Sequence, residues 1–200
     1  MDLIMTEQFD FYAYLNRMKY IVRWGLMRNT DCENIQEHSL QVAILAHALT
    51  LIHNKLLPED ELSPERACLY GVFHDAAEII TGDLPTPIKY YNPVIKDNYQ
   101  AIEDVAKEKL LSMLPEDMGD IYRSILFYEE QDSKYYPIVK AADKLSAYIK
   151  CAEEVKAGNR EFVKAMEATK KSLDESKLPE VKHFMQHYLE GYNKTLDEMN

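Results

Sequence analysis

The sequence predicts an all-α protein that forms one domain over residues 1–200. Apolar residues recur at helical spacing through nearly the whole chain, and strand-like alternation never extends beyond a few residues. With 200 residues, of which 46% are hydrophobic, the chain can build one sizeable core and is short for two full domains. Helices are expected at residues 6–20, 34–54, 64–81, 94–113, 116–130, 135–157, 159–175 and 178–197.

Helix ends and one loop are marked by particular residues. Asn34 and Glu37 have capping-box spacing at the start of the second predicted helix. Ser63 can cap the third, with Pro64 in its first turn. The segment TGDLPTPIKYYNP, residues 81–93, is rich in helix-breaking residues, and its prolines stiffen the chain. We expect this stiff loop to form one wall of a ligand site.

The composition limits the classes of partner. A formal net charge of −11 repels nucleic acid and anionic membranes, so a phosphate-bearing ligand must be held by a local positive patch or a metal. Small substrates are therefore favoured over polymers. No run approaches the roughly 18 apolar residues of a membrane span, and charged residues interrupt the first 20 positions, unlike a signal peptide. We expect a cytoplasmic protein that binds neither nucleic acid nor membranes.

The segment VFHDAAEIITGD, residues 72–83, places a histidine beside an aspartate in an otherwise apolar helix. On a wheel of about 100° per residue with His74 at zero, Asp75 points to about 100° and Glu78 to about 40°. Gly71 falls in the same sector, and apolar side chains take the other directions, as in a buried helix. Unpaired polar groups there would cost on the order of several kcal/mol. A metal ion is the economical partner, with Glu78 above it and Gly71 leaving room.

The residues alone leave alternatives open. A buried His-Asp pair without metal is the ordinary interpretation of such a dipeptide, so further ligands are needed. His38 lies near the start of the mostly apolar helix at 34–54, whereas Asp143 lies opposite the apolar stripe of its own helix and could face solvent. His183 and His187 are a rival pair with the i, i+4 spacing of two metal ligands.

Four segments carry a resemblance to a known family. They are EHS at 37–39, HDAAE at 74–78, TGDLPTPIK at 81–89 and AADKLSAYIKC at 141–151. In this order they resemble the HD-domain metal-dependent phosphohydrolases, and most closely the bacterial YfbR-like 5′-deoxynucleotidases. The similarity covers nearly the whole chain, from LNRMKYIVRWGLMRN at 15–29 onward. It implies an HD-type helical bundle with a buried mononuclear metal site.

The resemblance also implies which residues act. The residues implied as ligands of one divalent ion are His38, His74, Asp75 and Asp143. The residues implied in substrate binding are Arg23, Trp24, Asp83, Leu84, Pro85 and Thr86, together with His38, Asp75 and Asp143. Glu78 is implied as a catalytic carboxylate, and Arg23 and Asp83 are its expected catalytic partners. Residues 76–142 contain no histidine that could hold a second metal, so one ion is expected.

The implied ligand set predicts the chemistry. Two imidazoles and two carboxylates suit Co, Mn, Fe or Zn better than Mg. We expect hydrolysis of deoxyribonucleoside 5′-monophosphates to deoxynucleoside and phosphate by a homodimer. The alternatives are another HD phosphohydrolase, acting on a nucleoside triphosphate or a cyclic nucleotide, and a non-catalytic nucleotide-binding module stabilised by the metal.

Overall fold

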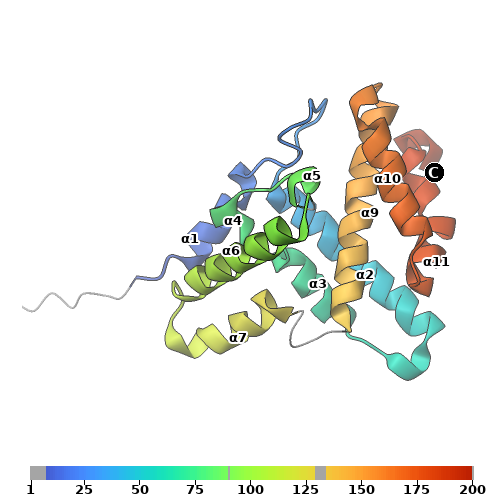
Figure 1. The fold of residues 1–200 in the computed structure, drawn as a ribbon. Helices are drawn as coiled ribbons and strands as arrows, with labels where there is room; N and C mark the ends of the chain where they lie inside the picture. Colours follow the sequence, from blue (N-terminus) through green and yellow to red (C-terminus); the bar gives the residue numbers. More distant parts are fainter. Residues whose placement is uncertain (1–7, 90, 129–133, 200) are drawn as a thin grey trace, which may run out of the picture.

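The computed structural model describes residues 8–89, 91–128 and 134–199, and it is built from helices (Figure 1). Its α-helices are α1 (Phe11–Leu15), α2 (Ile35–Leu56), α3 (Pro64–Phe73), α4 (Glu78–Thr81), α5 (Thr86–Lys89), α6 (Pro93–Leu111), α7 (Glu116–Leu126), α9 (Tyr135–Lys156), α10 (Val163–Asp174) and α11 (Pro179–His187). Short 3₁₀ helices lie at Asn16–Tyr20, Pro58–Asp60, Arg160–Phe162, Leu189–Asn193 and Leu196–Met199. Within these residues no strand forms beyond one antiparallel bridge between Val22 and Asn34. The predicted all-α class is confirmed.

Two long helices, α2 and α9, form the centre of the molecule. Figure 1 shows α10 and α11 on one side of α9, and α6 and α7 on the other. The larger core lies between α2, α3, α9 and α11 and includes Leu49 and Leu145, neither of which has any exposed surface. A second core, around Phe11, lies between α1, α6 and α7. Phe73 and Tyr122 pack against both cores, which makes the apolar interior continuous.

The predicted cap residues begin α2 and α3. Asn34 Oδ1 accepts hydrogen bonds from the backbone amides of Gln36 at 3.0 Å and Glu37 at 3.1 Å, and Glu37 Oε2 accepts one from the Asn34 amide at 3.2 Å. Ser63 Oγ accepts from the Arg66 amide at 3.1 Å. Both predicted helix starts are confirmed, and the first turn of α2, which carries His38, is fixed by a complete capping box.

The predicted helix over 64–81 is interrupted, so the prediction of one continuous helix was wrong. α3 ends at Phe73, residues 74–77 form turns, and α4 begins at Glu78. The carbonyl oxygen of Gly71 accepts a 2.8 Å hydrogen bond from His74 Nδ1, and the following amide of Ala76 bonds to the carbonyl of Phe73, three residues back. In a regular α-helix the Gly71 carbonyl would accept from the amide of Asp75. Here the His74 side chain bonds to it, and the helix ends.

Two terminal predictions also need correction. The segment predicted as one helix over 6–20 forms α1 followed by a 3₁₀ helix, and its first two residues lie outside the described residues. The last predicted helix, 178–197, is α-helical only to His187 and continues as 3₁₀ turns that contain Gly191. Within the described part of the chain, no helix is long and apolar enough to cross a membrane.

Gly71 marks the closest approach of α3 to α2. A Cβ atom added to it would lie 2.6 Å from Ala43 Cα and 2.8 Å from Ala43 N. Carbon atoms in ordinary contact are about 3.5–4.0 Å apart, so only glycine permits this helix crossing. The sequence interpretation that Gly71 leaves room for a metal was therefore wrong. Its role is to bring the helix of His38 against the helix that ends at His74.

Candidate metal centre and active site

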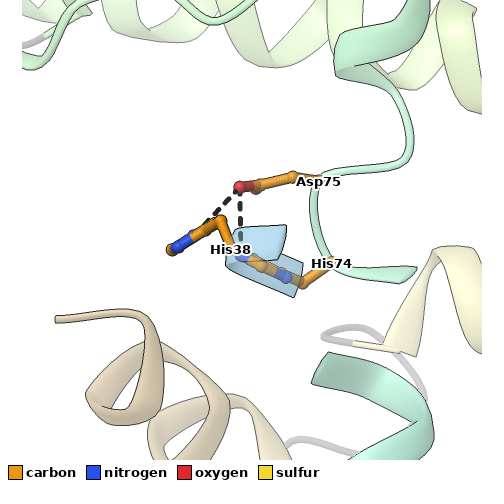
Figure 2. Close-up of side chains that lie close together, drawn as sticks. All are labelled: His38, His74 and Asp75. Atoms are coloured by element: carbon orange, nitrogen blue, oxygen red, sulfur yellow. Dashed lines mark ion pairs between the residues drawn. The ribbon is translucent and has the colours of Figure 1, made fainter. Parts of the chain in front are cut away.

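Two imidazoles and a carboxylate converge where α2 meets the end of α3 (Figure 2). His38 comes from the first turn of α2 and has no exposed surface. His74 Nε2 lies 3.0 Å from Asp75 Oδ2, and His38 Nε2 lies 3.5 Å from the same oxygen. One ligand atom from each of His38, His74 and Asp75 can be chosen so that all three lie within 4.8 Å of one another. This spacing suits three ligands of a single ion.

Asp143 brings a second carboxylate to the same point. It lies on α9, and its Oδ1 is 3.2 Å from His38 Nε2. The helical wheel had left open whether this side chain faces solvent, and the packing of α9 against α2 turns it inward. Of the residues predicted as metal ligands, the structure thus brings His38, His74 and Asp75 within 4.8 Å of one another and places Asp143 against His38.

Hydrogen bonds fix which nitrogen of each imidazole carries the proton. The Gly71 carbonyl can only accept, so the His74 Nδ1 that bonds to it carries hydrogen. Ser146 Oγ donates to Gln41 Oε1 at 2.5 Å and lies 3.0 Å from His38 Nδ1, so it accepts from that nitrogen. In the neutral form of each ring, Nε2 then carries a lone pair. Both Nε2 atoms are buried and have no hydrogen-bond partner among the described residues. Two buried lone pairs aimed at carboxylates fit a metal ion.

The charges around the two rings differ. Burial, followed by the positive charge of Arg23, lowers the pKa of His38, which favours the neutral ring that a metal requires. Burial also acts to lower the pKa of His74, but the Asp75 carboxylate beside the ring and the charge of Asp143 together outweigh it and raise that pKa. The carboxylates therefore attract positive charge to this point, where an ion can take the place of a proton.

Glu78 is a buried carboxyl group beside this cluster. It is the first residue of α4, its side chain is almost fully buried, and its Oε2 has no hydrogen-bond partner among the described residues. Burial, together with the negative charges of Asp75 and Asp83, raises its pKa well above the usual range. It lines a cavity with His74 and Asp75. A buried carboxyl group whose pKa is raised beside potential metal ligands is suited to proton transfer.

Lysines also line this cavity, and sequence reasoning missed them. Lys140 lies one turn before Asp143 on α9, and Lys89 lies at the end of α5. Burial acts to lower the pKa of Lys140, but the charges of Asp143 and Asp75 outweigh it and raise that pKa. The i, i+3 spacing of Lys140 and Asp143 on one helix was the available signal.

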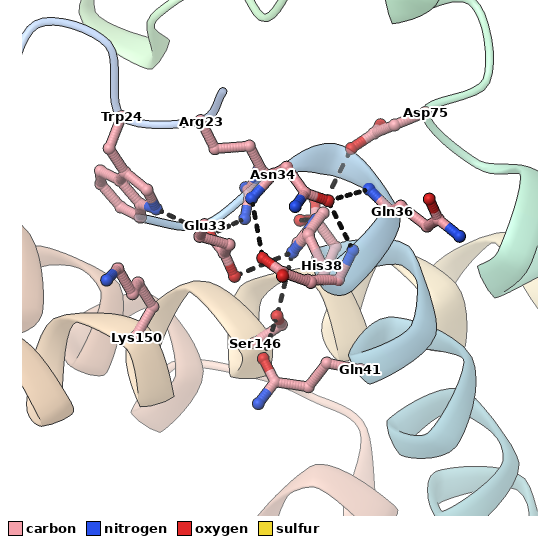
Figure 3. Close-up of polar contacts among 12 residues, drawn as sticks. Arg23, Trp24, Glu33, Asn34, Gln36, His38, Gln41, Asp75, Ser146 and Lys150 are labelled. Carbon is pink, nitrogen blue, oxygen red and sulfur yellow. Dashed lines mark hydrogen bonds and ion pairs between the residues drawn. The ribbon is translucent and has the colours of Figure 1, made fainter. Parts of the chain in front are cut away.

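Arg23 and Trp24 lie in the loop before α2, on the His38 side of the cluster (Figure 3). Arg23 Nη1 and Trp24 Nε1 both donate to Glu33 Oε2, at 2.8 and 3.1 Å. The Arg23 charge lies near Asp143 and Asp75 and acts on the pKa of His38. Sequence reasoning missed Glu33, because nothing in its loop position indicates that it reaches both side chains.

Asp83 completes this side of the site. Burial raises its pKa, while the Arg23 charge and a hydrogen bond from the Trp24 backbone oppose the rise. Asp83 therefore lies beside the residues with which the sequence grouped it. Leu84 and Pro85 are half-buried in the segment between α4 and α5. Thr86 begins α5, and its side chain lies outside the described part of the structure.

The rival histidine pair does not form a comparable site. The rings of His183 and His187 lie 4.4 Å apart on α11. In the described residues, the group of His38, His74 and Asp75 is the one set of three or more potential ligands that meets within 4.8 Å.

Known structures share this arrangement of helices. An HD-domain phosphohydrolase from Listeria innocua matches 92% of this chain and 88% of its own with a TM-score of 0.80, at 20% sequence identity. The cyanophage S-2L HD phosphohydrolase DatZ, solved with dA and one catalytic Zn²⁺ ion, matches 96% of this chain and all of its own with a TM-score of 0.61, at 24% identity. The fold is that of the HD-domain phosphohydrolases.

Sequence comparison assigns the chain more narrowly within that class. Residues 10–192 match the YfbR-like 5′-deoxynucleotidase family. A 5′-deoxynucleotidase of Photobacterium profundum is 50% identical over 97% of this chain and all of its own length, and one of Vibrio atlanticus is 46% identical over the same shares. This chain belongs to the YfbR-like 5′-deoxynucleotidase family, as the sequence motifs predicted.

Proposed function

We propose that this chain is a metal-dependent phosphoric monoester hydrolase that converts deoxyribonucleoside 5′-monophosphates to deoxynucleoside and phosphate. The observation that carries the proposal is the pair of buried, unpartnered imidazole Nε2 atoms of His38 and His74, beside two carboxylates and the buried carboxyl group of Glu78. Relatives that are 46 to 50% identical over nearly the whole chain and are named 5′-deoxynucleotidases support it.

The proposed metal site consists of His38, His74, Asp75 and Asp143, which would hold one divalent ion. Two nitrogen and two oxygen donors favour Co, Mn, Fe or Zn over Mg, which prefers oxygen ligands alone. The Zn²⁺ in the structure of DatZ agrees with a divalent ion at such a site. When bound, the ion supplies positive charge that neutralises the phosphate oxygens.

The proposed substrate site extends from the metal toward the loop of Arg23 and Trp24. Arg23 binds a phosphate oxygen, for which its buried Nε is available because it has no partner among the described residues. Trp24 lies against the sugar, where an indole leaves a ribose 2′-hydroxyl without a hydrogen-bond partner. The other proposed substrate residues are His38, Asp75, Asp143, Asp83, Leu84, Pro85 and Thr86.

Two carboxyl groups divide the proton transfers. Glu78 holds and deprotonates the attacking water, for which its raised pKa is suited. Asp83, beside Arg23 and Trp24, protonates the leaving 5′ oxygen or orients the sugar. A site that only stabilised the fold would need neither group, which favours hydrolysis over nucleotide binding alone.

We also propose a single-domain, cytoplasmic homodimer. On α2, Leu40, Ile44 and Leu51 lie on one face and are 51 to 61% exposed. They form a group and are not isolated apolar side chains on the surface, and such a group suits contact with a second copy. Sedimentation velocity of the wild type and of an Ile44→Glu variant tests this: the wild type should sediment as a dimer and the variant as a monomer.

Phosphate release is the direct test of the proposed function. With added Co²⁺ or Mn²⁺, the protein should release phosphate from dAMP and not from dATP or a cyclic nucleotide. A protein that binds dAMP without turnover would instead be a binding module. His74→Ala should remove the metal and the activity, whereas the matched His183→Ala on α11 should keep both. Full metal content in the His74→Ala variant would contradict the proposed site.

A further inference from the structure

One oxygen of Glu33 holds the two side chains that the proposed function places against substrate. Glu33 Oε2 accepts from Arg23 Nη1 at 2.8 Å and from Trp24 Nε1 at 3.1 Å, and the Glu33 side chain is only 12% exposed (Figure 3). Arg23 and Trp24 belong to no helix, so regular secondary structure does not fix their side chains. The Glu33 carboxylate therefore ties the guanidinium to the indole, whose ring also packs against that of buried Phe162 with the centroids 5.3 Å apart.

The backbone of the loop is shaped so that both side chains reach this oxygen. Trp24 has a φ of 60°, the one positive φ outside glycine among the described residues. This left-handed conformation is unfavourable for an aromatic residue and persists only where surrounding contacts enforce it. Successive side chains of an extended chain point in opposite directions, whereas here both converge. The Arg23 amide also donates to the Glu33 carbonyl at 2.9 Å, which joins the beginning and the end of the loop.

Glu33 also connects this loop to the proposed metal site. Its Oε1 lies 3.9 Å from His38 Nδ1, the nitrogen turned away from the ligand cluster. The Glu33 carboxylate engages Nη1 of Arg23 and leaves Nε free, buried and without a partner among the described residues. Glu33 thus orients the guanidinium through Nη1, while Nε remains available for a phosphate oxygen.

We propose that Glu33 is a positioning residue that couples phosphate binding to sugar selection, an inference that rests on the proposed function. By holding Arg23 and Trp24 on one oxygen, it fixes the distance between the bound phosphate and the indole wall that the sugar meets. A deoxynucleotide then fits both contacts at once. A ribonucleotide has to displace the indole, and with it the arginine that holds its phosphate.

The single tryptophan makes this inference directly measurable. Trp24 is the only tryptophan in the sequence, so intrinsic fluorescence reports on this one side chain. In Glu33→Ala, the freed indole should become more accessible to acrylamide, and its emission should respond less to dAMP. KM for dAMP should rise about tenfold or more, as expected for a lost hydrogen bond to a charged group. The preference for dAMP over AMP in kcat/KM should fall by a similar factor, with metal content unchanged.

Two further variants separate positioning from stability. Glu33→Gln keeps an acceptor oxygen without the charge and should restore part of the fluorescence response and of the selectivity. Glu37→Ala removes a nearby carboxylate that completes the α2 capping box but contacts neither side chain. It should lower the melting temperature without altering Trp24 fluorescence or the preference for dAMP.

The outcomes distinguish this inference from the proposed function. A wild-type protein that fails to hydrolyse dAMP with Co²⁺ or Mn²⁺ contradicts the proposed function itself. An active wild type, together with a Glu33→Ala variant of unchanged fluorescence and selectivity, overturns the role of Glu33 alone. Metal loss in Glu33→Ala would assign the residue to the support of His38 and would also overturn the inference.

Discussion

Gly71→Ala tests whether the α2–α3 crossing builds the metal site. The added methyl group would lie 2.6 Å from Ala43 Cα, 2.8 Å from Ala43 N and 3.1 Å from the carbonyl carbon of Val42. All three are backbone atoms, which cannot rotate away as the end of a side chain can. The two helices must therefore move apart at the point where they approach most closely.

The expected cost follows from these distances. Restoring an ordinary carbon–carbon contact of about 3.5–4.0 Å requires a separation of roughly 1 Å. Overpacking of this kind typically costs about 1–3 kcal/mol, against a gain of about 0.5–1 kcal/mol for replacing glycine within a helix. We expect a net loss of about 1 kcal/mol, which lowers the melting temperature of a protein of this size by about 2–4 °C.

Gly119→Ala is the matched control. It introduces the same methyl group into α7, where a Cβ atom would meet nothing within 4 Å. It should therefore gain about 0.5–1 kcal/mol from helix propensity alone. Thermal unfolding followed by circular dichroism measures both variants. A Gly71→Ala protein as stable as Gly119→Ala would refute the argument from close packing.

The same variant should weaken metal binding. His38 lies five residues before Ala43 on α2, and His74 lies three residues after Gly71, so a separated crossing moves the two imidazoles apart. A Co²⁺ titration followed by absorbance should show a lower Co²⁺ affinity for Gly71→Ala than for the wild type. Gly119→Ala should bind Co²⁺ as the wild type does. Unchanged affinity would show that the ligands are positioned independently of the helix crossing.

Three further changes test single groups. Glu78→Gln should keep the metal and bind dAMP, while turnover falls by about 10²–10⁴; turnover within a few-fold of wild type would leave Glu78 as a lining residue. Ser146→Ala removes the hydrogen-bond partner of His38 Nδ1 and should weaken metal affinity by about 10–100-fold in a Co²⁺ titration. Unchanged affinity would argue against a role of Ser146 in orienting the His38 ring. Burial of Glu154 opposes its ionisation, but hydrogen bonds from Lys150, Thr30 and Asn159 outweigh it and hold its pKa below the usual range. Glu154 thus contributes stability that is present above its unfolded pKa of about 4.3 and is lost as pH falls through the folded value. Denaturant unfolding from pH 7 to pH 3 should show a shallower loss in Glu154→Gln, and equal slopes would refute this linkage.

Local signals in the sequence were sufficient for most of the helices. The capping box of Asn34 and Glu37 and the cap at Ser63 act through neighbouring backbone amides, so residue types at fixed spacing predicted them. Asp143 could not be placed in this way. Its direction depends on α9 packing against α2, which is a contact between residues about 100 positions apart in the sequence. The family motifs supplied what periodicity lacked.

Glu33 and part of the environment of Lys140 depend on contacts between distant segments. Glu33 acts on Arg23 and Trp24 across a loop, and a loop has no fixed period from which side-chain directions follow. Lys140 shares a helix with Asp143, which has the larger effect on its pKa, but its place beside Asp75 depends on the turn after α3. Polar contacts between distant segments leave no periodic trace in a single sequence.

The break after α3 brings together residues that the helical wheel had grouped on a different backbone. In a continuous helix His74 and Asp75 would diverge by about 100°, which is a poor arrangement for two ligands of one ion. In the structure His74 Nδ1 bonds the Gly71 carbonyl, the next turn tightens, and His74 Nε2 and Asp75 Oδ2 come within 3.0 Å of each other. A local helical rule therefore fails at the site, where a departure from regular structure brings functional groups together. The hydrogen bond that ends α3 is also the bond that turns the Nε2 lone pair of His74 toward the proposed metal, so termination of the helix and orientation of the ligand have one cause.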